Sequence, residues 1–202
     1  MCFGDVNGFD PNPGDAKYVN RSRGAFVLER VDVIDFGGIT DGLSNTIFYS
    51  ERLVRGNTDN TRIYTRAIAN HRFSNPMDCI THAKGSNREF PSGATAYTTG
   101  SGSGGRIGDS LAFYTIFHTL LPPNAPGCCT AEEVGNGIHA ATSNHLGGVN
   151  VLFGDGSGRF VSETINCGTL SESHDDPPAS GTHFGVWGAL GTRAAGDQAM
   201  IP

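Results

Sequence analysis

Residues 143–165 read SNHLGGVNVLFGDGSGRFVSETI. Two strand-like runs, VNVLF at 149–153 and GRFVS at 158–162, flank an Asp-Gly pair, and this arrangement is the strongest short-range signal of a β-hairpin. With Asp155-Gly156 as the two central turn residues, Val151 pairs with Phe160. The register predicts a core-facing side made of Val149, Val151, Phe153 and Phe160.

The same stretch raises the question of whether His145 and Asp155 form a catalytic pair. An extended chain of ~3.3 Å per residue between Val149 and Asp155 separates its ends by roughly 20 Å. A catalytic dyad needs hydrogen-bond reach, about 3 Å. We therefore predict separate structural roles: Asp155 adopts the φ > 0 turn geometry that Asp tolerates, and His145 hydrogen-bonds backbone where the chain enters the hairpin.

Composition narrows the class of protein. The chain has 202 residues, 29 of them glycine, and a net charge of −6. Its only lysines are Lys17 and Lys84, which argues against binding by neutralisation of nucleic-acid phosphates. We find no apolar run near the 18 residues of a membrane span and no signal-peptide pattern.

Short strand-like runs separated by turn residues favour an α+β fold dominated by an antiparallel sheet, with long Gly-rich loops. We expect strands at 24–36, 47–53 and 110–121, a strand or short helix at 61–69, and a short helix or turn at 184–197. The prediction is a single domain over 1–202. Its parts are an N-terminal loop region (1–23), a surface excursion (85–109), the hairpin (143–165) and a C-terminal tail (171–202).

Four blocks of this sequence, in this order, resemble one family. They are ITDGLSNTIFYSERL (39–53), FHTLLPPNAPGC (117–128), the H-x9-DG stretch from His145 to Asp155-Gly156, and VWGALGTRAAGD (186–197). The chain is similar to the H-x9-DG pseudopilin-like family of planctomycete bacteria, a domain of unknown function (1559). The motif residues that the resemblance singles out as structural are His145, Gly147, Gly148, Asp155, Gly156, Asp41, Gly42, Ser44 and Asn45.

The resemblance implies a pilin-like head domain. Type IV pilins and type II secretion pseudopilins begin with a leader and a long apolar helix, which this sequence lacks, so a membrane link is expected only through that missing helix. The implied function is that of a non-catalytic, extracytoplasmic structural protein that acts in filament or secretion-apparatus assembly. Its implied partners are like subunits or secretion components, and the family supplies no catalytic residues to transfer.

Two other functions remain open at this point. An extracellular ligand- or carbohydrate-binding module would use the Trp187 region or the 85–109 excursion. A hydrolase is less favoured, because no G-x-S-x-G pattern occurs. The Asp41-Gly42-x-Ser44-Asn45 block is expected to form an Asx-type turn that caps backbone N–H groups.

The cysteines and acidic residues give the candidate cross-links and metal sites. Cys79, Cys128, Cys129 and Cys167 are candidates for disulfides in an oxidising compartment, with buried thiols as the alternative. A zinc site from Cys128, Cys129, His139 and His145 is disfavoured, because adjacent cysteines rarely bind one metal ion. No cofactor is expected. Calcium, which some pseudopilins hold, has weak candidates in Asp5, Asn7 and Asp10, without EF-hand spacing.

Overall fold

The computed structural model describes residues 1–5, 22–27, 34–54, 66–67, 75–82, 112–129, 137–197 and 199. In chain order the elements are η1 (Phe36–Gly38), β1 (Ile47–Ser50), β2 (Arg66–Ala67), α2 (Pro76–His82), α3 (Ala112–Thr115), β3 (Cys128–Cys129), β4 (Gly137–Ile138), β5 (Gly148–Phe153), β6 (Gly158–Ser162) and α4 (Gly185–Gly191).

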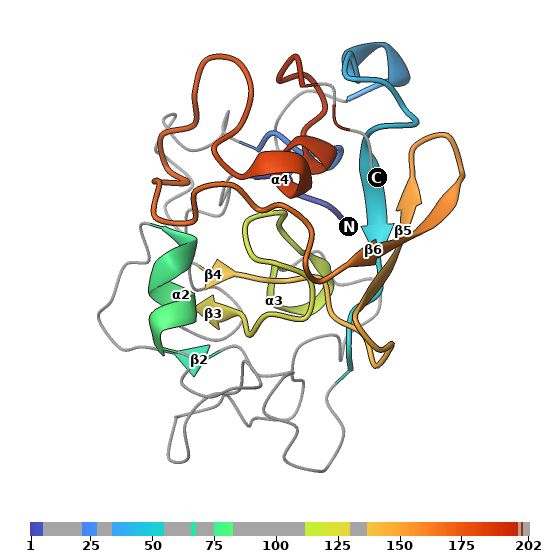
Figure 1. Cartoon of the computed structure of the whole chain (residues 1–202). Coiled ribbons are helices and arrows are strands. Elements are labelled where there is room, and N and C mark those ends of the chain that lie inside the picture. The colour runs from blue at the N-terminus through green and yellow to red at the C-terminus, as the bar shows by residue number, and fades with distance from the viewer. Residues whose placement is uncertain are drawn as a thin grey trace.

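The strands form two small sheets. One has the order β1-β5-β6 and is antiparallel throughout. The other has the order β2-β3-β4, with β2 parallel to β3 and β3 antiparallel to β4. In Figure 1 the β5–β6 hairpin projects at one side of the molecule and α2 lies at the opposite side. The chain is thus a sheet-dominated α+β protein with few helices, as the sequence predicts.

The predicted hairpin is present, but its register differs from the prediction by one residue. Val149 pairs with Val161, and Val151 pairs with Arg159. The cause is a three-residue loop: Phe153 N–H donates to the Ser157 carbonyl at 2.9 Å, and Gly156 N–H donates to the Phe153 carbonyl at 3.0 Å. Gly156 has φ +86°, the left-handed conformation that closes such a loop.

The register shift moves Phe160 from the core face to the outer face. A shift of one residue reverses the side that every residue of a strand faces. Val161 is fully buried, whereas Phe160 is 48% exposed. The prediction that Phe160 packs in the core is therefore wrong, and Val161 takes that place beside Val149 and Val151.

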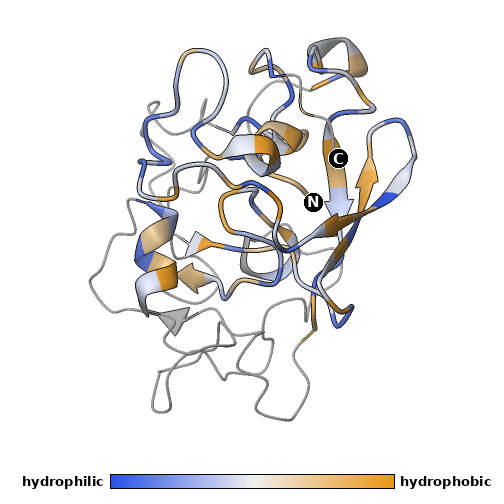
Figure 2. Ribbon diagram, viewed as in Figure 1, coloured by the Kyte–Doolittle hydropathy of each residue, from blue (hydrophilic) through white to orange (hydrophobic). Residues whose placement is uncertain are grey.

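The inner face of the β1-β5-β6 sheet packs against α4. Trp187 of α4 is fully buried and its indole Nε1–H donates to the Leu121 carbonyl at 2.8 Å. Figure 2 shows hydrophobic residues concentrated on α4 and the strands, with hydrophilic residues at the hairpin tip. An ideal Cβ on Gly191 would lie 1.9 Å from Thr119 Oγ1, so only glycine allows α4 to end this close to the 117–121 segment.

Other segments differ from the expectations in instructive ways. The expected strand at 110–121 begins with a single helical turn, α3, and continues as loop with one isolated bridge. Its aromatic and β-branched residues favour strand in general, but tertiary packing overrides so short a preference. The α2 helix was not predicted. Of the expected strand at 24–36, residues 28–33 lie outside the described part.

Residues 1–5, in the loop region expected over 1–23, belong to no strand or helix but are packed into the rest of the chain. Cys2 forms an isolated parallel bridge with Phe117, and its N–H donates to the Phe48 carbonyl at 2.9 Å. Both Cys2 and Phe3 are buried. Residues 6–21 lie outside the described part. Among the described residues, no helix has both the length and the apolar character needed to cross a membrane.

Candidate functional site

Asp155 organises the hairpin turn. Its Oδ1 accepts hydrogen bonds from the backbone N–H of Ser157 at 2.8 Å and from the Ser157 hydroxyl at 2.7 Å. These bonds from Ser157 lower the pKa of the Asp155 carboxyl below its ordinary value. The prediction that Asp155 adopts φ > 0 is wrong, because Asn124 is the only described non-glycine residue with positive φ; in the longer loop Asp155 forms an Asx-type turn and Gly156 takes the positive φ.

His145 lies at the other end of β5 and contacts a different carboxylate. Its Nε2 is 3.0 Å from Glu51 Oε1. The backbone N–H of His145 donates to the Ser143 hydroxyl oxygen at 3.0 Å. The six residues of β5 separate His145 from Asp155. The two residues therefore act separately. The expectation that His145 bonds to backbone is wrong, because its ring contacts the side chain of Glu51, the residue directly after β1.

Glu51 is the centre of this contact. Its Oε2 accepts the backbone N–H of Asn150 at 2.8 Å, and its Oε1 accepts the Asn150 side-chain amide at 3.2 Å. Partial burial works against the charge, yet the bonds from Asn150 and His145 hold the pKa of Glu51 below its ordinary value. The Glu51 carboxylate, directly after β1, thus contacts both His145, in the loop before β5, and Asn150, within β5.

Asn124, from the 117–128 block, hydrogen-bonds the segment that leads into β5. It has φ +62°, a conformation that asparagine tolerates better than most residues. Its Oδ1 accepts the Ser143 N–H at 2.8 Å, and its Nδ2 donates to the Gly148 carbonyl at 3.1 Å. An ideal Cβ on Gly148 would lie 2.1 Å from the Val161 carbonyl oxygen, which explains why glycine stands there.

Asp41 joins the 39–53 block to the C-terminal block. Its carboxylate accepts the N–H groups of Ala195 at 2.7 Å and Gly196 at 2.8 Å. The predicted local Asx turn is therefore replaced by a long-range cap. The turn itself is closed by the Asn45 N–H, which donates to the Gly42 carbonyl at 3.0 Å, and Gly42 has φ +98°. Of the other predicted motif residues, Ser44 is exposed. Gly147 has φ +81°, and a Cβ placed on it would meet no atom within 4 Å.

The hairpin tip rests on this same block. Gly154 N–H donates to the Thr46 carbonyl at 3.0 Å, and Asp155 N–H donates to the Leu43 carbonyl at 3.2 Å. All four sequence blocks are thus joined by hydrogen bonds into one frame around the β1-β5-β6 sheet. Sequence reasoning missed Glu51, Asn124 and Asn150, whose roles depend on partners that are distant along the chain.

The outer face of the sheet is the surface that this frame supports. Tyr49 lies opposite Leu152 in the strand pairing, and Phe160 lies diagonally beside Leu152. Their exposures are 43%, 40% and 48%, and Leu146, in the loop that His145 holds, is fully exposed. Large apolar side chains gathered on one face are typical of interaction surfaces.

The cysteines are placed as cross-link and core residues. Cys79 of α2 and Cys128 of β3 form a disulfide with a Cα–Cα distance of 5.7 Å. Cys129 and Cys167 hold buried thiols, as does Cys2. The zinc combination is not assembled: Cys128 is in the disulfide, and within the described ranges no group of three or more His, Cys, Asp or Glu side chains is arranged to hold a metal ion.

Three buried histidines lie beside the disulfide region. His118 and His139 stack with ring centroids 5.9 Å apart, and the His139 N–H donates to His118 Nδ1 at 3.2 Å. Burial, with the nearby charges of His174 and Arg52, lowers the pKa of His118 to about 3. Burial likewise lowers the pKa of His139 well below its ordinary value. The His118 and His139 imidazoles are neutral core residues at neutral pH.

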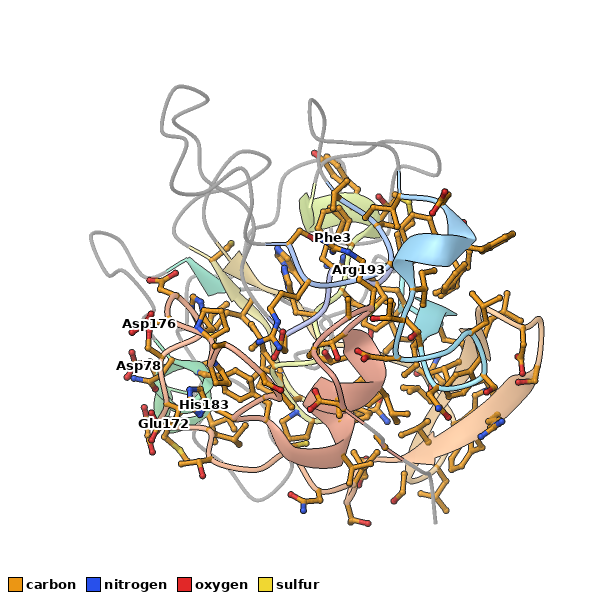
Figure 3. The ribbon with its side chains drawn as sticks, turned by 90° about the horizontal axis from the view of Figure 1, so that it is seen from above. Phe3, Asp78, Glu172, Asp176, His183 and Arg193 are labelled. Atoms are coloured by element: carbon orange, nitrogen blue, oxygen red, sulfur yellow. A yellow bond between two sulfur atoms is a disulfide. The ribbon has the colours of Figure 1, made fainter. Side chains whose placement is uncertain are left out.

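The calcium candidates do not form a site in the part of the chain that is described. Asp5 is fully buried, 3.2 Å from the Arg23 guanidinium, and accepts the Thr182 hydroxyl. Burial raises its pKa despite Arg23. Asn7 and Asp10 lie outside the described residues. Figure 3 shows a separate acidic group, Asp78, Glu172 and Asp176, near His183 on the α2 side. These side chains are not arranged to hold a metal ion either.

The ligand-binding alternative loses its aromatic residue. Trp187 is fully buried against Leu121, so its ring is inaccessible to a sugar or other surface ligand. The second part of that prediction, residues 85–109, lies outside the described part. Among the described residues, exposed aromatic side chains remain at Phe36 and, on the outer face of the hairpin sheet, at Tyr49 and Phe160.

Comparison with known proteins gives one match. A family model described as "Protein of unknown function (DUF1559)" matches residues 4–168, a range that holds three of the four sequence blocks. No curated protein matches the chain, and neither does any solved structure.

Proposed function

The chain belongs to the DUF1559 family, and from this premise we propose that it is a non-catalytic structural and interaction domain. It is the extracytoplasmic head of a pilin- or pseudopilin-like subunit. It acts in assembly of a surface filament or secretion apparatus, with like subunits or secretion components as partners. It needs no cofactor and binds no nucleic acid.

The observation that carries this proposal is the outer face of the β1-β5-β6 sheet. Tyr49, Leu152 and Phe160 expose large apolar surface there, while the sheet below them is fixed by the Glu51 and Asp155 hydrogen bonds. A rigid face with exposed aromatic residues suits protein–protein contact, because little conformational freedom is lost when a partner binds.

Two further observations support the proposal. Three polar residues of the blocks direct their side chains at the chain's own backbone: Asp41 to Gly196, Asp155 to Ser157 and Asn124 to Gly148. Such residues build the fold rather than a reaction centre. The Cys79–Cys128 disulfide suits an oxidising compartment such as the cell surface.

The test is localisation in the native cells. Antibody against the domain should label extended assemblies on intact cells, and shearing should release the domain with them. Recovery of the domain only from the cytoplasm, or only as dispersed protein, would refute the subunit role. Labelled cells without assemblies would refute the filament form of the proposal.

A paired variant asks whether the outer face does the assembling. Leu146→Ser with Leu152→Ser should reduce the sheared assemblies several-fold, because it removes apolar surface from the face. Leu146 is fully exposed, whereas Leu152 is 40% exposed, so the free energy of unfolding should fall by about 1 kcal/mol. The matched control is Met77→Ser, at a 37% exposed position on α2, at the opposite side of the molecule (Figure 1).

A further inference from the structure

β6 is the edge of its sheet. Among the described residues its only neighbour is β5. Glu163 N–H donates to the Gly147 carbonyl at 2.8 Å, and in an antiparallel ladder every second residue bonds to the same neighbour. Residues 159, 161 and 163 therefore face β5. The N–H and C=O groups of Gly158, Phe160 and Ser162 point away from it, along the open edge.

Apart from the charged Arg159, this edge lacks the usual devices against pairing. Natural edge strands are commonly protected by lysine, proline or a bulge, but β6 reads GRFVS and pairs with β5 without a register shift. Phe160, at its centre, is 48% exposed and lies across Gly148 of β5. Figure 1 shows the hairpin at the periphery of the molecule, where a second strand has room to approach.

We propose that two copies of this chain pair through β6, antiparallel and centred on Phe160, so that their sheets join into one of six strands. In this register each outward-facing residue meets an outward-facing residue: Phe160 meets the second copy's Phe160, and Gly158 meets the second copy's Ser162. Both kinds of pair exchange two N–H···O=C bonds across the two-fold axis. Centring the pair on Gly158 or Ser162 instead would leave Phe160 opposite a loop or turn residue.

The side chains favour a second copy as the occupant. The two Phe160 rings meet on the outer face, and aromatic cross-strand pairs are stabilising. On the inner face Arg159 lies diagonal to the second copy's Glu163, and the two-fold axis repeats this opposite-charge pair. In its own chain the Arg159 guanidinium is 4.7 Å from the ring centroid of Phe153 on β5, and Glu163 Oε2 is 3.5 Å from Asn124 Nδ2, so both side chains would turn from these contacts to meet across the open edge.

The inference rests on the proposed function and deepens it, since it names the contact between like subunits. Its failure is distinguishable from failure of that function. Pairing is measured with purified protein in solution, whereas the subunit role is judged by location on cells. A surface protein that stays monomeric would keep the proposed function and lose only this contact.

The decisive experiment is a pair of cysteine variants. Phe160→Cys places two thiols directly opposite, with Cα atoms about 5.5 Å apart, within disulfide range. Gly158→Cys, the matched control, places its thiols roughly 13 Å apart along the paired strands, and a Cβ at Gly158 meets no close atom. Under mild oxidation Phe160→Cys should give about tenfold more covalent dimer, with wild-type protein as background for the native thiols.

A backbone variant tests the hydrogen bonds themselves. Phe160→Pro removes an N–H that points away from β5, a place where edge strands accept proline, whereas Phe160→Thr keeps that N–H. Sedimentation at millimolar protein should show dimer for wild type, weaker dimer for Phe160→Thr and monomer for Phe160→Pro. Equal cross-linking of the two cysteine variants, or a monomeric wild type, overturns the proposal. The cysteine comparison decides if Phe160→Pro does not fold.

Discussion

Asp41 Oδ1 accepts the backbone N–H of Gly196 at 2.8 Å, joining segments 155 residues apart. The same carboxylate accepts the Ala195 N–H and the Thr192 hydroxyl. Charge-assisted bonds to backbone donors are among the stronger single interactions in a fold. The C-terminal block is therefore held in part by one side chain from the 39–53 block.

Replacing Asp41 should release that block. Asp41→Ala leaves the N–H groups of Ala195 and Gly196 without their acceptor, and we expect a loss of about 2 kcal/mol in the free energy of unfolding. Urea denaturation measures it. The matched control is Asp35→Ala, which removes a single exposed bond to Gly38 and should cost less than about 1 kcal/mol. Equal losses for the two variants would contradict the role given to Asp41.

Glu51 and His145 should contribute unequally. Glu51→Ala removes the bonds to Asn150 as well as the contact to His145, and we expect a loss of about 1–2 kcal/mol. His145→Ala removes only an exposed pair and should cost less than about 1 kcal/mol. Urea midpoints of the two single variants measure the difference, and a larger loss for His145→Ala would be contrary to this account.

The Glu51 contribution should also depend on pH. Because its folded pKa lies below the ordinary value, its stabilisation is present above the unfolded pKa and disappears as the pH falls through the folded pKa. The stability gap between wild type and Glu51→Ala should therefore close under acid conditions. A gap that persisted at low pH would show that the carboxylate's charge is irrelevant.

The buried histidines predict destabilisation by acid. In the unfolded chain a histidine takes up a proton near pH 6.5, whereas burial lowers the folded pKa of His118 to about 3. Stability is thus full above pH 6.5 and falls as the pH drops from there. Each such histidine contributes about 1.4 kcal/mol per pH unit once the unfolded state is protonated.

His118→Asn isolates one of these contributions. Its amide oxygen replaces the acceptor that His118 Nδ1 offers to the His139 N–H, but it does not titrate. The variant should show a shallower fall of unfolding free energy between pH 6 and pH 4, by about 1.4 kcal/mol per unit, measured relative to each protein's own value at pH 7.5. An unchanged slope would mean that His118 is already protonated in the folded state.

The disulfide should carry a large share of stability. Cys79 and Cys128 are 49 residues apart in sequence, and closing a loop of that size restricts the unfolded chain by about 4 kcal/mol. Cys79→Ser with Cys128→Ser should lose about that much, measured by urea denaturation. Reductant should lower the stability of wild type towards the double variant and leave the double variant itself unchanged.

The hairpin shows both the reach and the limit of sequence reasoning. Alternating apolar residues and an Asp-Gly pair predicted both strands, because these signals are local. The register went wrong since the same letters fit a two-residue or a three-residue loop. The bond from Gly156 N–H to the Phe153 carbonyl settles that choice, and with it the side on which Phe160 stands.

The hydrogen-bonded frame could be predicted only in part. The resemblance drew attention to Asp41 and His145, yet not to Glu51, which lies 94 residues from His145. A polar partner at that separation leaves no periodic pattern in the sequence. Likewise, the candidate cysteines were recognisable by type, but only folding brings α2 beside β3 and so selects Cys128 rather than Cys129.

The cross-link also determines how the chain responds to mechanical force. If tension is applied at the two ends, residues between Cys79 and Cys128 cannot lengthen the molecule while the bond is intact. Roughly 170 Å of contour length is thereby withheld from extension. In a domain pulled within a filament, only the segments outside residues 79–128 would extend. The residues between the two cysteines would bear no tension until the disulfide was reduced.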